Sequence, residues 1–361
     1  MPTESTPAGV APPAGAARLV AIVCAAQFMV MVDVAIVNVA LPSIHDSLGF
    51  SDTGLQWVVN AYTLILAGFL LLGGRAGDLL GRRRVFLVGV TLFTASSLVC
   101  ALAASPATLV AARAVQGLGG AIISPSSLAI LSSSFPSGHE RNRAFGAWAA
   151  MSGFGGTVGM LLGGVLTQVF GWEAIFLINI PIGLAILALG RGLIPALDEH
   201  ERGRRFDFAG AILITAGLTA IVFGIVRTDV LGWGSAGVIG PLLGGAALLG
   251  LFALVEGRIA SDPLVPLRIF SEPLLRAANL VVILLFVGAF AVWYFLSLYM
   301  QQVGGLDPLE AGLGFVPMTL AVFLSTSVAA RLIRRFGVRS VLTGGMLLTS
   351  AGMLMLTAVD A

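Results

Sequence analysis

The chain has 361 residues, of which 57% are hydrophobic and 11% are charged, and its mean hydropathy is +0.99. Soluble domains carry about 25% charged residues, so most of this surface must face lipid and a water-soluble globular protein is excluded. The formal net charge of +2 gives no indication of nucleic acid as a partner.

The chain begins with a polar segment and then turns apolar. Residues 1–17 are rich in Ala, Pro, Ser and Thr and lack hydrophobic periodicity, which predicts a disordered tail. The following apolar run contains Asp33 and has neither an Arg-rich start nor a small-residue cleavage site. We therefore interpret it as a retained membrane span and not as a signal peptide.

Long apolar runs continue to the last residue. A helix needs about 20 mainly apolar residues to cross a bilayer, and by that rule we expect an all-α membrane protein with about eleven transmembrane helices. These spans are predicted at 19–41, 54–74, 85–104, 107–131, 144–169, 173–193, 207–227, 237–257, 276–300, 309–329 and 341–361.

Two polar loops divide these spans into groups. The loop 194–206 follows a first six-helix bundle at 18–193 and precedes a pair of helices at 207–257. The proline-containing loop 258–275 precedes the last helices, at 276–361.

The arginines indicate the orientation of the chain. With the N-terminus in the cytoplasm, 18 of the 20 arginines fall at cytoplasmic ends or loops, Arg227 lies outside and Arg113 lies within the fourth span. Cytoplasmic loops of membrane proteins carry an excess of Lys and Arg. The pattern predicts a multi-pass protein of the bacterial plasma (inner) membrane with a cytoplasmic N-terminal tail.

The first span contains polar residues on two faces. Helical geometry places Gln27 and Asn38 on one stripe and turns Asp33 by more than roughly 100° from both. A carboxyl group at membrane depth is disfavoured as an anion, which makes Asp33 a candidate proton carrier. A neutral hydrogen bond between helices is the alternative. Gln27 and Asn38 are candidates for a substrate cavity.

The fourth and second spans also carry polar stripes. Arg113, Gln116 and Ser124 share one face of the fourth span. Because a guanidinium group cannot lose its charge inside a protein, Arg113 needs a carboxylate, carbonyl groups or a wet cavity. A functional arginine facing a cavity and a structural clamp are both open. Gln56 and Asn60 of the second span line the same cavity or serve in packing.

Glycines are expected to let helices approach one another closely. Gly117 lies beside Arg113, and Gly155, Gly159 and Gly163 form a small-xxx-small ridge on the fifth span. The ridge serves close packing, or bending and sealing against a neighbouring helix.

The ninth span carries Trp293 and Ser297 on one face, either as part of an interfacial aromatic belt or as a wall that stacks on a lipophilic or cationic substrate. Cys24 and Cys100 lie inside apolar runs and indicate neither a disulfide nor a metal pair. The sequence contains no metal-ligand cluster and no nucleophile–base pair. We therefore predict neither an enzyme nor a metal site, and no cofactor besides a proton gradient.

Several motifs resemble those of a known transporter family. The turn after the second span reads Gly74-Arg-Ala-Gly-Asp78-Leu-Leu-Gly81-Arg82-Arg83-Arg84 and resembles the signature loop of the major facilitator superfamily. The span-four motif of that family, Arg-x-x-Gln-Gly-x-Gly-x-Ala, is present from Arg113 to Ala121. The segments 33–42 and 176–183 are similar to those of drug:proton antiporters with fourteen spans, the EmrB/QacA type.

This resemblance implies a fold and roles for single residues. It implies two six-helix bundles around a central cavity with two inserted spans, into which 207–257 would fit. Residues 276–361 would then be an incomplete C-terminal bundle of a truncated chain, with about eleven of fourteen spans. Asp33 and Arg113 would serve proton coupling, and a cytoplasmic gating loop would consist of Gly74, Asp78, Gly81, Arg82 and Arg83. The turn 331–339 looks like a degraded copy of that loop, with Gly337 aligned to Gly81.

The expected function is proton-coupled multidrug efflux, in which a drug:H+ antiporter exports lipophilic or cationic small molecules. Its partners would be the substrate, protons and the lipid bilayer, and we expect a monomer. The alternatives are an exporter of a specific metabolite, lipid or siderophore, and a non-functional truncated transporter.

Overall fold

The computed structural model describes residues 15–135, 138–195, 207–258 and 267–357. Throughout these ranges the regular secondary structure is helical, which confirms the predicted all-α fold. The tail 1–17 lies outside them except for its last three residues, and so do most of the predicted loop 194–206 and about half of 258–275.

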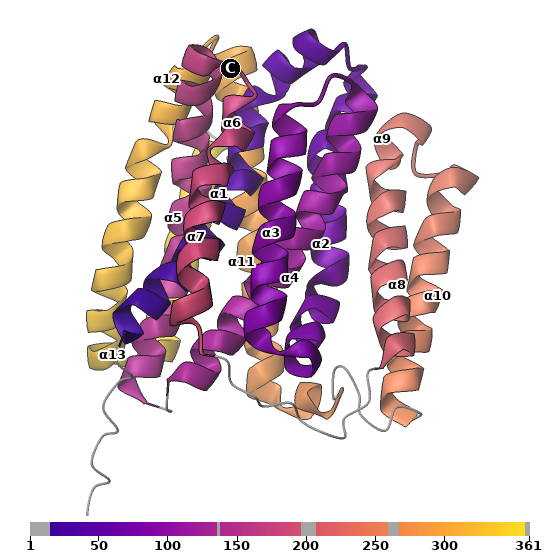
Figure 1. Ribbon diagram of the computed structural model, residues 1–361. Coiled ribbons are helices and arrows are strands. Elements are labelled where there is room, and N and C mark those ends of the chain that lie inside the picture. Colours follow the sequence, from indigo (N-terminus) through magenta and orange to yellow (C-terminus); the bar gives the residue numbers. More distant parts are fainter. Residues whose placement is uncertain (1–14, 136–137, 196–206, 259–266, 358–361) are drawn as a thin grey trace, which may run out of the picture.

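The first six predicted spans correspond to a bundle of long helices (Figure 1). They are α1 (Ala16–Leu48), α2 (Asp52–Leu80), α3 (Arg82–Ala101), α4 (Pro106–Ser134), α5 (His139–Phe170) and the pair α6 (Ala174–Leu177) and α7 (Asn179–Leu193).

The remaining helices follow in two groups. The first group contains α8 (Phe208–Val226), α9 (Thr228–Leu231) and α10 (Ala236–Arg258). The second contains a 3-10 helix (Leu267–Ser271), α11 (Pro273–Leu298), a π-helical turn (Tyr299–Val303), α12 (Pro308–Gly314) and α13 (Val316–Leu356).

Local sequence explains where the helices begin and end. The Ser51 hydroxyl accepts a hydrogen bond from the Gly54 amide and caps the start of α2. Ser105 caps α4 in the same way, and Pro106 follows at the first helical position. Gly49 ends α1 and Gly81 separates α2 from α3, both with positive φ values that favour glycine.

Within the described ranges, nine helices are long and apolar enough to cross a membrane. They match the first eight predicted spans and the eleventh. Shorter apolar stretches, Pro273–Ala289 and Leu309–Val322, lie in the predicted ninth and tenth spans. The total of eleven therefore stays a prediction.

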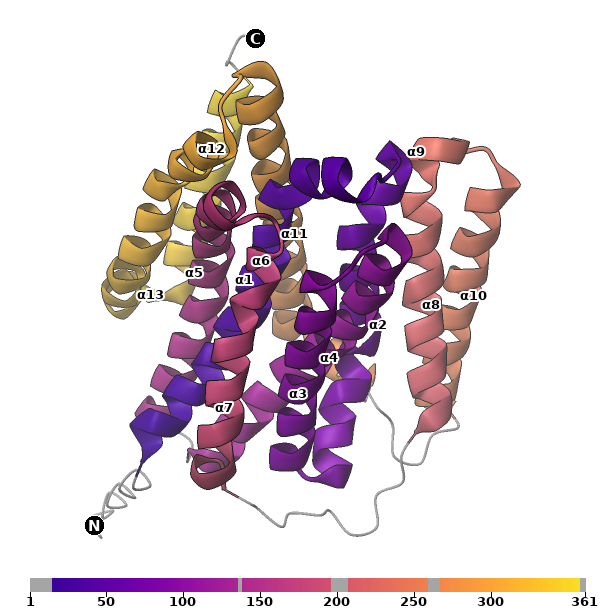
Figure 2. The same ribbon diagram turned by 45° about the horizontal axis from the view of Figure 1, so that its top comes forward.

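The bundle is built from close helix pairs. Helix α1 packs mainly against α5, while α4 packs against both α2 and α3 (Figures 1 and 2). Helix α1 also contacts α4 and α7, so it lies centrally in the N-terminal half. Two buried apolar clusters, one around Val30 and Phe93 and one around Ile36 and Phe176, fill the space between these helices.

Helices α8 and α10 form a hairpin beside the bundle (Figure 2). The main contact between this hairpin and the bundle is α8 against α2. There the Thr215 hydroxyl donates to the Gly68 carbonyl at 2.7 Å, and the rings of Trp57 and Phe223 lie 5.9 Å apart.

The last helices contact the bundle through α5. Helix α12 and the start of α13 pack on α5, and Phe315 is buried in a small cluster with Ala35 and Met160. Helix α13 runs through the predicted turn 331–339 and is interrupted at Gly337, where φ is 79° and ψ is 162°. Gly337 thus has the positive φ that Gly81 has between α2 and α3.

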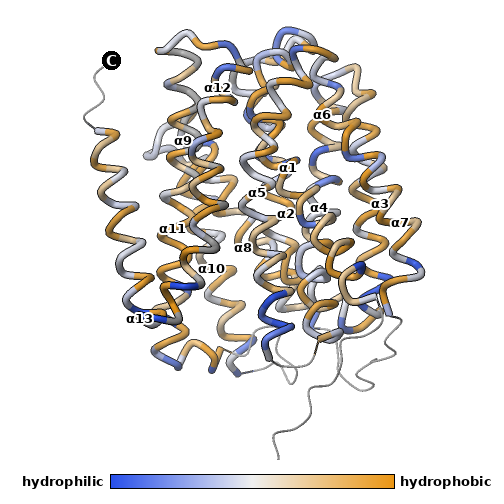
Figure 3. The backbone as a smooth tube through the Cα atoms, turned by 90° about the vertical axis from the view of Figure 1, so that its left-hand side faces the viewer, coloured by the Kyte–Doolittle hydropathy of each residue, from blue (hydrophilic) through white to orange (hydrophobic). Residues whose placement is uncertain are grey.

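Hydropathy follows the expectation for a membrane protein. Figure 3 shows apolar residues along most of the helical length and most hydrophilic residues near helix ends. Large apolar side chains such as Val169, Leu184, Leu243 and Leu284 are exposed on outer faces. Because such a surface is unfavourable in water, it is suited to lipid.

Candidate functional site

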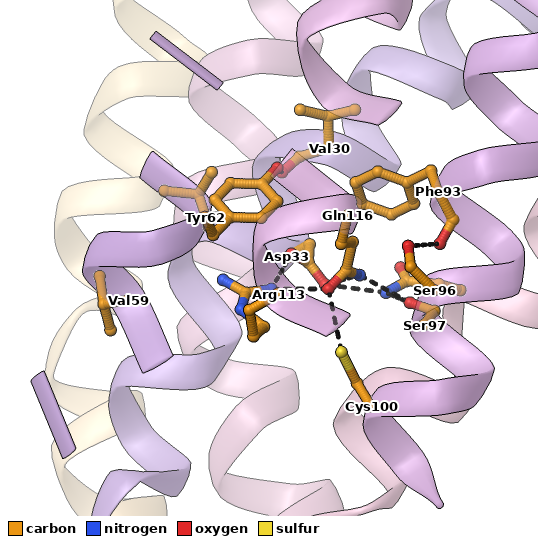
Figure 4. Close-up of polar contacts among 12 residues, drawn as sticks. Val30, Asp33, Val59, Tyr62, Phe93, Ser96, Ser97, Cys100, Arg113 and Gln116 are labelled. Atoms are coloured by element: carbon orange, nitrogen blue, oxygen red, sulfur yellow. Dashed lines mark hydrogen bonds and ion pairs between the residues drawn. The ribbon is translucent and has the colours of Figure 1, made fainter. Parts of the chain in front are cut away.

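A buried ion pair joins α1 to α4 at the centre of the N-terminal half (Figure 4). Arg113 Nη1 donates to Asp33 Oδ2 at 2.5 Å and to Gln116 Oε1 at 2.9 Å. Arg113 Nε donates to the Val58 carbonyl of α2 at 3.0 Å. The two charged side chains are 0% and 1% exposed, so each has its partner inside the protein.

The second carboxylate oxygen is held by two amides. Asp33 Oδ1 accepts from Gln116 Nε2 at 2.8 Å and from Asn179 Nδ2 at 3.0 Å. Both amide nitrogens also donate to Ser97 Oγ, at 2.7 Å and 2.9 Å. We call Asp33, Ser97, Arg113, Gln116 and Asn179 the polar core; it joins α1, α3, α4 and α7.

Apolar and aromatic groups surround the polar core. The guanidinium carbon of Arg113 lies 4.2 Å from the ring centroid of Tyr62 and 5.7 Å from that of Phe176. Such stacking favours a desolvated cation. The Cys100 thiol donates to Gln116 Oε1 at 3.6 Å. A buried pair of charges is stable only when its remaining lone pairs and protons are also bonded, and the amides and the serine provide this.

The local sequence explains how α4 supplies two members of the polar core. Arg113 and Gln116 are three residues apart and lie on the same face of the helix. Gly117 follows on that face, and a Cβ atom there would meet the Tyr62 carbonyl of α2. The glycine therefore lets α2 approach α4 closely enough for Arg113 to reach the Val58 carbonyl.

The structure joins Asp33, Arg113 and Gln116 by hydrogen bonds. Gln27 is buried and donates to Ser152 of α5 at 3.2 Å, and Asn38 donates to carbonyl groups of its own helix. Gln56 is exposed, and Asn60 and Ser124 are half-buried. The side chains of Trp293 and Ser297 lie outside the described part of the structure.

The predicted gating loop lies at the junction of α2 and α3. Arg82 Nη2 lies 3.4 Å from Asp78 Oδ1, and Arg82 Nη1 donates to the Ala129 carbonyl of α4 at 3.3 Å. Gly74 lies against Pro125 of α4. Gly81 makes the turn, and Arg83 follows it in the first turn of α3. The loop thus ties α2 and α3 to α4.

The glycine ridge of α5 faces α1. A Cβ atom at Gly159 would lie 2.7 Å from the Val32 carbonyl, and one at Gly163 would lie 2.8 Å from the Ile36 carbonyl. At Gly155 the nearest atom would be the Met31 Cβ, at 2.8 Å. The α1–α5 seam therefore needs residues without side chains at these positions.

Two members of the polar core were not among the predicted site residues. Asn179 lies in the segment 176–183, which resembles drug:proton antiporters, but the sequence did not indicate a role for its side chain. Ser97 gave no signal, because serine is common in membrane helices and often bonds to its own backbone, as Ser96 does. In the described part of the chain, no group of three or more His, Cys, Asp or Glu side chains could hold a metal ion.

Comparison with known proteins places the chain in a family. The sequence profile of the Major Facilitator Superfamily matches residues 23–360. The chain is 43% identical to the cephamycin export protein CmcT of Amycolatopsis lactamdurans over 91% of its own length and 68% of that protein. It is 40% identical to the puromycin resistance protein pur8 of Streptomyces alboniger over 94% of its length and 67% of that protein.

Other comparisons agree. The chain is 35% identical to the tetracenomycin C resistance and export protein of Streptomyces glaucescens over 92% of its length and 62% of that protein. It thus spans about two thirds of the length of these relatives. A crystal structure of the peptide transporter POT with sulfate matches 89% of this chain and 69% of that one, with a TM-score of 0.59 and 16% identity. That likeness shows the fold.

Proposed function

Because this chain belongs to the major facilitator superfamily of membrane transporters, we propose that it exports lipophilic or cationic small molecules in exchange for protons. The observation that carries the proposal is the ion pair of Asp33 and Arg113, buried among four helices. Ionisable side chains at membrane depth are costly and in transporters serve ion and proton pathways.

The geometry supports a simple coupling mechanism. In the described conformation Asp33 is bonded as a carboxylate, with Arg113 on one oxygen and two amides on the other. A proton that binds Asp33 removes its negative charge and so removes the ion pair that links Arg113 to α1. Protonation therefore favours a different arrangement of α1 and α4. Substrate and proton then oppose each other through the conformational equilibrium.

We also propose that the chain is of the EmrB/QacA type with fourteen spans, monomeric, and located in the plasma membrane with its N-terminus in the cytoplasm. The separate α8–α10 hairpin supports the assignment to this type, because its position beside α2 suits a pair of inserted helices. The orientation is supported by the distribution of arginines. The Asp78–Arg82 pair would then close the cytoplasmic side in one state.

The printed names of the relatives support antibiotics as cargo. One relative is named for puromycin resistance, and two are named for export of cephamycin and of tetracenomycin C. The single compounds in those names also favour a second candidate function, in which the chain exports one specific metabolite. Competition distinguishes the two: a multidrug exporter is inhibited by unrelated lipophilic cations, whereas a specific exporter is not.

Asp33→Asn is expected to abolish gradient-driven uptake of puromycin into everted vesicles, because an amide cannot bind and release the proton. The measurement is uptake of radiolabelled puromycin with an imposed proton gradient and with the gradient collapsed by an uncoupler. Exchange of puromycin across the membrane without a gradient should persist, since this variant retains a polar side chain at position 33.

Asp46→Asn is the matched control, because it makes the same chemical change on the same helix but at the exposed end of that helix. It should leave uptake unchanged. The proposal would be contradicted if uptake by the wild type did not depend on the proton gradient. It would also be contradicted if Asp33→Asn still showed gradient-driven uptake. Uptake of several unrelated compounds by the wild type is measured as well, to cover the case in which puromycin is not transported.

A further inference from the structure

The polar core contains one amide, that of Asn179, whose nitrogen is hydrogen-bonded and whose oxygen has no partner among the described residues. Asn179 is 0% exposed and donates both amide hydrogens, one to Asp33 Oδ1 and one to Ser97 Oγ. Its carbonyl oxygen Oδ1 is buried and has no hydrogen-bond partner in the described part of the chain. In contrast, Gln116 uses both ends: its oxygen accepts from Arg113 and its nitrogen donates to Asp33 and Ser97.

The hydroxyl group of Ser97 also has a hydrogen-bonding capacity that is not fully used. A hydroxyl group has one hydrogen to donate and two lone pairs to accept with. The Ser97 oxygen accepts from Gln116 and from Asn179, which occupies both lone pairs. The hydrogen of Ser97 therefore stays available, next to the amide of Asn179. Every bond in this arrangement fits an ionised Asp33, which accepts and does not donate.

A proton on Asp33 Oδ1 breaks this match. The protonated oxygen becomes a donor and then faces the N–H group of Asn179, so that two donors meet. A half-turn of the Asn179 amide exchanges its nitrogen and oxygen. The carbonyl oxygen then has one lone pair for the Asp33 hydroxyl and one for the Ser97 hydroxyl. The last torsion of asparagine is broad and roughly two-fold, so the amide can adopt both orientations without torsional strain.

We propose that Asn179, together with Ser97, is a positioning residue that sets the proton affinity of Asp33 by donating to its ionised form and accepting from its protonated form. The inference rests on the proposed proton coupling at Asp33 and adds two residues to it. It also assigns a role to the buried carbonyl oxygen of Asn179. Neither residue contacts the cargo in this assignment; both act through Asp33.

The charged and titratable groups around Asp33 are few in the described part of the chain. Helix α4 contributes Arg113, α2 contributes Tyr62 and α3 contributes Cys100. The charged side chains of the other packed helices lie at helix ends: His139, Glu140, Arg141 and Arg143 on α5, Arg191 on α7 and Glu310 on α12. The neutral groups that bond directly to Asp33 are the amides of Gln116 and Asn179.

The test reads the titration of Asp33 directly, without any cargo. The purified full chain in lipid bilayers is titrated with pH while the infrared band of protonated carboxyl groups is recorded, and Asp33→Asn identifies the contribution of Asp33. Asn179→Leu removes the donor to the ionised form, so the midpoint should move to higher pH. A hydrogen bond to a charged group corresponds to about a tenfold change in an equilibrium constant, so the expected shift is about one pH unit.

Two serines on α3 provide a matched pair. Ser97→Ala should move the midpoint in the same direction as Asn179→Leu, because the amides lose their second partner. Ser96→Ala makes the same change one residue away, where the buried hydroxyl bonds only to its own helix, and should leave the midpoint in place. The hydroxyl of Asn179→Ser can donate or accept, so this variant should shift the midpoint less than Asn179→Leu does.

The outcomes separate the inference from the proposed function. A midpoint that stays unchanged in both Ser97→Ala and Asn179→Ser overturns the inference, even when Asn179→Leu does not fold. An Asp33 band that shifts as expected supports the inference, whether or not puromycin is transported. If the wild type shows gradient-driven uptake and the band does not respond to Asn179, the proposed function stands and the inference fails alone.

Discussion

Arg113→Met is expected to destabilise the protein by about 3–5 kcal/mol, because it leaves a buried carboxylate without its charged partner. The substitution also removes the donors to the Val58 carbonyl and to Gln116. Methionine is long and flexible enough to fill much of the same space. Thermal unfolding can be followed with a thiol-reactive dye, since Cys24 and Cys100 are both buried and free.

The reverse experiment isolates the charge. The double variant Asp33→Asn/Arg113→Met should recover most of the lost stability, because neither buried charge remains. Arg113→Lys should not rescue it fully, since an ammonium group lacks the planar fork that binds Asp33, Gln116 and Val58 together. If the double variant unfolds as early as Arg113→Met, packing and not charge accounts for the loss.

Gly117→Ala is expected to loosen the seam between α2 and α4 and lower the stability by about 1–3 kcal/mol, the usual range for overpacking. The added methyl group meets the Tyr62 carbonyl, which is backbone and cannot turn away as a flexible side chain does. The two helices must then separate. The same unfolding assay in detergent and in bilayers measures the loss.

Gly146→Ala is the counterpart on α5, where a new Cβ atom finds no heavy atom within 4 Å. In a helix, alanine is favoured over glycine by up to about 1 kcal/mol, so this variant should be as stable as the wild type or more so. The two substitutions are chemically identical and should have opposite signs. Equal effects would mean that close approach of α2 and α4 is not the cause.

The sequence was sufficient to predict the nine described helices that are long and apolar enough to cross a membrane, and part of the polar core. Apolar runs of about 20 residues predict spans because each buried backbone group must be bonded within the segment. Charge alone predicted that Arg113 needs a carboxylate, carbonyl groups or a wet cavity, and the structure provides the Asp33 carboxylate and the Val58 carbonyl. The spacing of Arg113 and Gln116 then placed both on one face of α4.

The remaining members depended on contacts between distant segments. Ser96 and Ser97 are adjacent and equivalent in the sequence, yet Ser96 bonds to its own helix and Ser97 enters the polar core. Gln27 and Asn38 share a stripe, but one reaches α5 and the other its own backbone. Which polar side chain meets which neighbour depends on helix rotation and crossing, and a periodic pattern along one helix does not contain that information.

The hairpin of α8 and α10 is fastened to the protein mainly along a single helix, through contacts such as Thr215 with Gly68. In the proposed transport cycle, a shift of α2 would carry the hairpin with it and displace the lipids around the hairpin. Each cycle would then include work against the bilayer, so membranes of different thickness or fluidity should change the turnover rate without altering any bond in the polar core.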